Sequence, residues 1–212
     1  MNDEWANEFF EDEFEKQDPW KFFTSSYEQK KYIRQINLIK DRKPNPKKIL
    51  EIGCAEGAHT KIINEVFPSA KIVAVDISYR AIKRAEKNIH SDKINFIQAD
   101  IINYINFFQN NEFDVIFWSE SIYYIGDRLS TRHMFDFLEK VIKKLDKNGL
   151  ICLANIINQA DEVESSITKR SIMKQYFNML RDCSNLVHFS VFVEFKKESN
   201  QKYEYQIWIF KR

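Results

Sequence analysis

Glycine is scarce in this sequence: only four of the 212 residues are glycine, whereas proteins average about 7%. Because glycine takes positive φ angles at little steric cost, each of the four is expected at a position of special geometry. They are Gly53, Gly57, Gly126 and Gly149, and the first two lie only four residues apart. This pair is therefore the first place to look for a ligand-binding turn.

Other absences exclude whole classes of protein. The three cysteines form no CxxC pair, which argues against a disulfide framework and a structural zinc site, so we predict no metal and a reducing, cytoplasmic setting. No apolar run approaches the roughly 18 residues of a membrane span, and the acidic start is unlike a signal peptide.

The sequence also has no excess of charge of either sign, since the formal net charge is only +1. The composition therefore predicts neither a nucleic acid nor a membrane as partner. The distribution is nevertheless uneven, because residues 1–18 contain eight acids and residues 27–48 contain eight lysines or arginines. These blocks either face each other or are separately solvated.

From residue 47 onward, short β-branched runs alternate with segments of helical periodicity. This alternation predicts βαβ crossovers and a mostly parallel sheet covered on both faces. Two period-two segments, 187–195 and 203–211, predict an antiparallel hairpin at the C-terminal end. We therefore predict an α/β fold with a doubly wound, seven-stranded, mostly parallel sheet of Rossmann-like type. The parallel strands are expected at 47–53, 71–76, 94–100, 113–119 and 149–156.

Two helical segments, about 3–16 and 26–42, precede the first strand. They predict a division into a helical N-terminal cover, residues 1–46, and a main domain, residues 47–212.

The segment ILEIGCAEGAHT, residues 49–60, connects the first strand to the helix that follows. Gly53 ends the strand and Gly57 opens the helix, so the backbone can approach a ligand closely while the helix N-terminus presents N–H groups. The dinucleotide fingerprint G-x-G-x-x-G lacks two of its three glycines here. The pattern present is instead acid-x-Gly-x-x-x-Gly, beginning at Glu51 and with Ala55 at its centre.

This pattern resembles the first motif, E/D-x-G-x-G-x-G, of the class I S-adenosylmethionine-dependent methyltransferases, with Ala55 replacing the central glycine. The resemblance implies S-adenosylmethionine as cofactor and S-adenosylhomocysteine as product. Asp76 ends the second strand, where a carboxylate accepts hydrogen bonds from a ribose diol, although a solvated helix cap is an alternative. The resemblance further implies that Asp100 and the N–H of Ile101 bind adenine. The predicted cofactor residues are Trp20, Tyr27, Glu51, Gly53, Ala55, Gly57, Asp76, Ile77, Asp100, Ile101 and Ser119.

The fourth strand ends in FWSESIYYIGD, and in the resembled family this strand end faces the transferred methyl group. Glu120 is predicted either to accept a proton from the methyl acceptor or to orient it, or else to orient the cofactor. Tyr123 and Tyr124 are predicted to form a wall of the acceptor pocket, with partly buried core positions as the alternative. Gly126 is expected to let the following loop turn.

The segment DPWKFFTSSYEQKKY, residues 18–32, is similar to that of the narrower nodulation protein S-like subgroup. The rhizobial member of that subgroup methylates the free amine of a deacetylated chitin-like oligosaccharide. The likeness implies that this segment folds over the cofactor, with Trp20 and Tyr27 excluding water. Without the likeness, the segment is an amphipathic helix packed on the sheet edge.

The resemblance thus predicts a methyltransferase that acts on an amine or hydroxyl of a small molecule, preferably a sugar or saccharide. One alternative is an RNA or protein methyltransferase that docks through its basic run. Another is a cofactor-binding or partner-binding module without turnover, for which Ala55 is the hint. The sequence gives no prediction of oligomeric state.

Overall fold

A seven-stranded sheet forms the centre of the computed structural model, which describes residues 4–159, 163–196 and 201–212. The strand order is β3-β2-β1-β4-β5-β7-β6. Strands β1 to β5 are parallel, and β7 runs antiparallel to both β5 and β6. The predicted fold class is therefore confirmed. The strands are β1 (Lys48–Ile52), β2 (Lys71–Asp76), β3 (Ile94–Gln98), β4 (Phe113–Ser119), β5 (Leu145–Gln159), β6 (Asn185–Lys196) and β7 (Gln201–Lys211).

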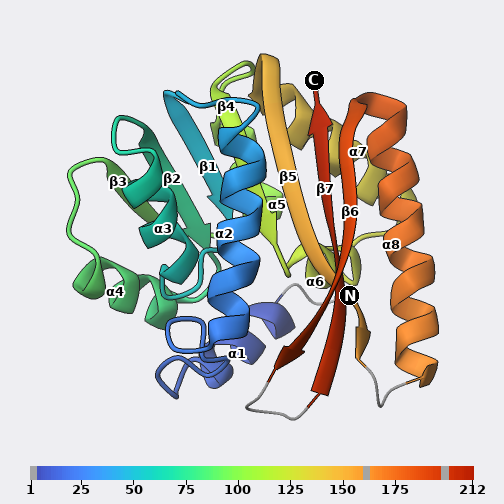
Figure 1. Ribbon diagram of the computed structural model, residues 1–212, viewed down its shortest axis with the longest axis horizontal. Helices are drawn as coiled ribbons and strands as arrows, with labels where there is room; N and C mark the ends of the chain where they lie inside the picture. The colour runs from blue at the N-terminus through green and yellow to red at the C-terminus, as the bar shows by residue number, and fades with distance from the viewer. Residues whose placement is uncertain (1–3, 160–162, 197–200) are drawn as a thin grey trace.

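Helices cover both faces of this sheet (Figure 1). The helices α2 (Ser26–Lys40), α3 (Ala58–Val66) and α4 (Tyr79–Asn88) contribute to the apolar cluster on one face, and α1 (Glu4–Glu13) contacts α4. The opposite face is covered by α5 (Ile101–Tyr104), the 3₁₀ turn η1 (Ile105–Phe107), α6 (Ile122–Gly126), α7 (Thr131–Lys144) and α8 (Val163–Cys183).

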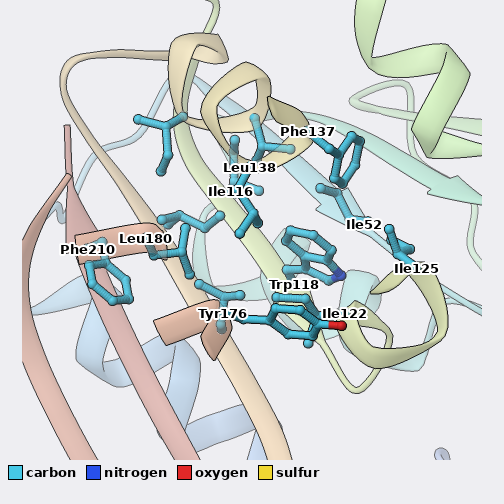
Figure 2. Packing of buried hydrophobic residues seen from close by; sticks show 14 of the residues in the cluster. Ile52, Ile116, Trp118, Ile122, Ile125, Phe137, Leu138, Tyr176, Leu180 and Phe210 are labelled. Atoms are coloured by element: carbon cyan, nitrogen blue, oxygen red, sulfur yellow. The ribbon is translucent and has the colours of Figure 1, made fainter. Parts of the chain in front are cut away.

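The central strand β4 shows why the parallel strands are continuous apolar runs. Val115 and Phe117 belong to the cluster on the α2 face, whereas Ile116 and Trp118 belong to the cluster on the α7 face. All four side chains are fully buried. Figure 2 shows Ile116 and Trp118 among side chains of α7 and α8, including Tyr176. A strand buried on both faces needs apolar residues at every position, so the sequence shows no alternation.

Helix α8 was not predicted, since the interval 156–185 showed no readable motif. Among its described side chains, Met173, Tyr176 and Leu180 are buried against the sheet. Their spacing of three and four residues is typical of one face of a helix, so the sequence does contain a signal for this helix.

The expectation for Gly126 was wrong, because this residue lies in helix α6 rather than in a turning loop. A Cβ atom placed on Gly126 would lie 1.7 Å from the hydroxyl oxygen of Tyr176. Glycine is thus favoured here because the Tyr176 ring of α8 lies against the backbone of α6.

Among residues 4–18, the ion pairs of the acidic block are formed with α4 rather than with the basic block. Glu11 forms an ion pair with Arg80 at 3.2 Å. Arg84 donates to the carbonyl oxygens of Glu15 and Lys16. The purely solvated alternative is therefore also wrong for these residues.

Several cations of the basic block pair with carboxylates of the main domain. Lys43 contacts Asp114 at 3.2 Å and Asp146 at 3.3 Å, and Arg34 pairs with Glu194. Much of the positive charge of this block is therefore compensated within the protein. Separately, no helix among the described residues has the length and apolar character needed to cross a membrane.

Candidate functional site

The connection between β1 and α3 is a tight turn in which three residues have positive φ. Gly53, Ala55 and Gly57 have φ angles of +74°, +49° and +87°. Ala55 thus takes the left-handed conformation that the central glycine of the family motif would favour. For an alanine this conformation costs about 1–2 kcal/mol, so other contacts must hold the turn in place.

Asp76 supplies such a contact from the end of β2. Its Oδ2 accepts a hydrogen bond from the N–H of Ala55 at 2.8 Å, and its Oδ1 accepts one from the N–H of Ser78 at 2.9 Å. Burial raises the pKa of Asp76 to about 6, although both N–H groups oppose the shift. The carboxylate is therefore fixed in orientation beside the turn, and it is ionised at neutral pH.

Asp100 follows β3 and has more contacts than the sequence suggested. Its Oδ1 caps α5 by accepting from the N–H of Ile102 at 3.1 Å. Arg128 forms a bidentate ion pair with the same carboxylate, with an Nη1 to Oδ1 distance of 3.1 Å. The N–H of Ile101 has no acceptor inside its own helix, since it belongs to the first turn of α5.

These groups open into a cavity of about 270 Å³ at the carboxyl ends of the parallel strands. Its lining follows the sheet order, from Asp100 after β3 through Asp76 and Gly53 to Glu120 after β4 and Ile156 of β5. The sheet reverses its strand order between β1 and β4, which is where ligands bind in doubly wound sheets. The predicted site residues that line this cavity are Trp20, Tyr27, Gly53, Ala55, Asp76, Ile77, Asp100, Ile101, Ser119, Glu120, Tyr123 and Tyr124.

Two predicted site residues, Glu51 and Gly57, do not line the cavity. Glu51 is buried beneath the turn, where it accepts a hydrogen bond from Thr60 at 2.5 Å and contacts Nδ1 of His59 at 3.0 Å. The observed contacts of Glu51 thus join β1 to α3. Gly57 is the N-cap residue that precedes α3.

Aromatic side chains from the N-terminal segment cover the cavity. Phe14 and Trp20 pack edge to face, with ring centroids 5.2 Å apart, and Trp20 stacks on Phe22 at 5.5 Å. Phe10 of α1 packs against Tyr124 of α6 at 5.0 Å. The first helix and the loop after it therefore form an aromatic wall of the cavity.

A buried charged cluster lies at the β4–β5 end of the cavity. Lys31 of α2 is 1% exposed, and its Nζ lies 2.7 Å from Oε2 of Glu28 and 3.1 Å from Oε1 of Glu120. Burial lowers the pKa of Lys31, but the charges of Glu120 and Glu28 outweigh it, so the net shift is upward. The cluster combines two carboxylates with one ammonium and has a formal charge of −1.

Glu120 itself is held by contacts on both carboxylate oxygens. Its Oε2 accepts from the N–H of Ile156 at 3.0 Å and from the hydroxyl of Tyr123 at 3.4 Å. Burial, together with the charge of Glu120, raises the pKa of Tyr123 well above its ordinary value, so this phenol remains a donor. Glu120 has φ +58°, a strained conformation that is concentrated at functional sites.

Sequence reasoning overlooked several cavity residues, among them Lys31, Arg128 and Tyr203. A signal for Lys31 was present, because Glu28, Lys31 and Gln35 lie on the same side of α2 as its apolar residues. All three are buried. Polar residues on the buried side of a helix indicate an internal polar site. Arg128 and Tyr203 showed no comparable pattern.

The donor set of the cavity fits S-adenosylmethionine. Asp76 offers an oriented carboxylate for a ribose diol, and the N–H of Ile101 is available for an adenine nitrogen. The net negative charge of the Glu28, Lys31 and Glu120 cluster suits a sulfonium cation.

Comparison with known proteins gives consistent matches. The family model described as nodulation protein S (NodS) matches residues 2–160. The Nodulation protein S of Bradyrhizobium diazoefficiens is 28% identical over 128 residues, which span 60% of this chain and 58% of that relative. The chain thus matches little more than half the length of that relative. The Malonyl-[acyl-carrier protein] O-methyltransferase of Halalkalibacterium halodurans is 44% identical over 63 residues, which are 29% of this chain and 23% of that protein.

A solved structure has the same fold over nearly the whole chain. The N-methyltransferase NodS from Bradyrhizobium japonicum WM9, in complex with S-adenosylhomocysteine, superposes with a TM-score of 0.76. The superposition covers 98% of both chains at 20% sequence identity.

Proposed function

This chain belongs to the nodulation protein S family of class I S-adenosylmethionine-dependent methyltransferases, and we propose that it methylates an amino group of a saccharide. The observation that carries the choice of an amine is the buried cluster of Glu28, Lys31 and Glu120. Its formal charge of −1 lies at the cavity end next to β4. A negative site favours a cationic ammonium over a neutral hydroxyl.

The saccharide part of the proposal is supported by similarity. The segment 18–32 of this chain resembles the nodulation protein S-like subgroup, whose rhizobial member methylates a chitin-like oligosaccharide. The description of NodS as an N-methyltransferase supports the amine instead. Tyr27 and Tyr203, whose ring centroids lie 5.5 Å apart, add apolar surface to the same end of the cavity. A hydroxyl group of a saccharide is the alternative acceptor.

In the proposed reaction, S-adenosylmethionine supplies an electrophilic methyl group, and the sulfur retains the electron pair of the broken bond. Glu120 binds the acceptor as an ammonium and takes one proton from it, and the lone pair freed on the aligned nitrogen would form the new bond to the methyl carbon as the carbon–sulfur bond breaks. The Oε1 atom of Glu120 contacts Lys31 and retains capacity for a second donor, since a carboxylate oxygen accepts about two hydrogen bonds. Asp76 is proposed to bind the ribose, and Asp100 and Ile101 the adenine. Trp20 and the aromatic cover exclude water.

A matched pair of acceptors tests this proposal. The purified protein is incubated with S-adenosylmethionine and either chitosan tetramer, which has free amines, or the fully N-acetylated tetramer. We expect S-adenosylhomocysteine release and a methylated product with the free-amine tetramer only. Equal transfer to both tetramers would indicate a hydroxyl acceptor. Transfer to neither, with intact binding of S-adenosylhomocysteine, would contradict the saccharide acceptor.

A further inference from the structure

Lys31 lines the cavity from α2, as Glu28 does, whereas Asp76, Asp100 and Glu120 line it from strand ends. Its Nζ is enclosed by Glu28 and Glu120, and it lies 5.7 Å and 5.6 Å from the ring centroids of Tyr27 and Tyr32. A buried ammonium is stable only when carboxylates pair with it. These two ion pairs and two ring contacts together fix the position of the Lys31 ammonium.

The Glu120 carboxylate needs a partner with a fixed position, and the Lys31 ammonium is such a partner. The backbone of Glu120 is in the left-handed region, and its N–H donates to the carbonyl of Ala154 at 2.9 Å. Its Oε2 is held from the sheet side by Ile156, whereas its Oε1 is held from the helix side by Lys31. Without the ammonium, Glu28 and Glu120 would leave two like charges in one buried region, and repulsion would turn the Glu120 side chain away.

We propose that Lys31 is a positioning residue, which fixes the Glu120 carboxylate at the methyl-transfer end of the cavity. Lys31 acts through Glu120 and does not itself bind the cofactor. The inference rests on the proposed function, because that function gives Glu120 its contact with the acceptor amine. Helix α2, which precedes the first strand, thereby contributes directly to the geometry of the reaction.

A double-mutant cycle tests whether Lys31 acts through Glu120. The variants are Lys31→Met, Glu120→Gln and the double variant, each assayed with the free-amine tetramer. We expect Lys31→Met to lower kcat by about tenfold or more while KM for S-adenosylmethionine changes less than about threefold. In the Glu120→Gln background, the same change should lower kcat less than about twofold. An equal loss in both backgrounds, or an unchanged kcat in Lys31→Met, would overturn the proposal.

Two further variants distinguish a loss of Glu120 positioning from a loss of folding. Lys31→Arg keeps the cation and should recover part of the lost kcat. Glu28→Gln/Lys31→Met also removes the second buried carboxylate beside Glu120, and it should restore folding but not kcat. The control is Lys43→Met, which removes another lysine with two carboxylate neighbours, Asp114 and Asp146. Lys43 does not line the cavity, so its kcat should equal that of the parent.

Melting temperatures provide a readout that needs no acceptor. The losses in Tm caused by Lys31→Met and Glu120→Gln should be less than additive in the double variant. Additive losses would contradict the contact. If the parent methylates no amine but the losses remain non-additive, the proposed function fails and the positioning of Glu120 stands. If the parent is active but the kcat effects are independent, the positioning role fails and the proposed function stands.

Discussion

The N–H of Ala55 donates a hydrogen bond to Oδ2 of Asp76 at 2.8 Å, which joins the turn after β1 to the carboxylate that ends β2. The family motif has glycine at this position, and the structure shows why alanine is compatible with it. The Asp76 carboxylate holds the left-handed backbone of Ala55 in place. The departure from the motif therefore leaves both the turn and the orientation of Asp76 intact.

Ala55→Gly is expected to raise the free energy of unfolding slightly. Glycine removes the left-handed penalty of about 1–2 kcal/mol but adds about 0.5–1 kcal/mol of unfolded-chain entropy, so the net gain is about 0.5 kcal/mol. Urea unfolding at pH 7 measures this difference. A loss of stability would mean that the strain of the alanine conformation is smaller than the entropy cost of glycine.

Binding of S-adenosylhomocysteine is expected to weaken as the pH falls through about 6. Asp76, whose pKa is raised to about 6 by burial, must be ionised to accept the hydrogen bonds of a ribose diol. Protonation below that pH removes its charge. Calorimetry from pH 5 to 8 measures the effect.

The variants at this position provide the controls. Asp76→Asn cannot titrate, so its affinity should not change with pH in that range. Asp76→Ala should weaken binding by about 1.5–3 kcal/mol at pH 8. Affinity equal to that of the parent in Asp76→Ala would contradict the ribose assignment.

Glu120→Gln is expected to lower the methyl-transfer rate by about 10²-fold at saturating cofactor, because the amide cannot receive a proton. Affinity for S-adenosylhomocysteine, which has no sulfonium charge, should change little. The matched control is Glu139→Gln, a half-buried α7 residue that pairs with Lys143 and does not line the cavity. A rate within a factor of two of the parent would leave Glu120 with an orienting role only.

Gly126→Ala is expected to destabilise the fold by about 2 kcal/mol through overpacking. The new methyl group would meet the Tyr176 hydroxyl oxygen, 1.7 Å from the position of the Cβ atom. Tyr176→Phe removes that oxygen, so the double variant should recover part of the loss. Thermal unfolding of the two single variants and the double variant measures this coupling, and strictly additive effects would contradict the steric explanation.

Strands were predicted correctly from the sequence where the apolar pattern of a short segment determines its secondary structure. Runs such as 71–76 and 113–119 were recognised as strands because β-branched and aromatic residues are continuous there. Helix α8 was overlooked although Met173, Tyr176 and Leu180 have helical spacing. The resemblance to the family then identified twelve of the 26 residues that line the cavity, many of them at strand ends, where motif residues lie.

The sequence by itself determined the parallel sheet, the glycine-containing turn and the acids at the strand ends, since each depends on residues that are near one another in the chain. Only the tertiary structure decided which distant charges meet. Lys31 and Glu120 are 89 residues apart in sequence, and Asp100 and Arg128 are 28 apart. No local pattern encodes such pairs, because they form only when packing removes both groups from water and brings them within a few ångströms.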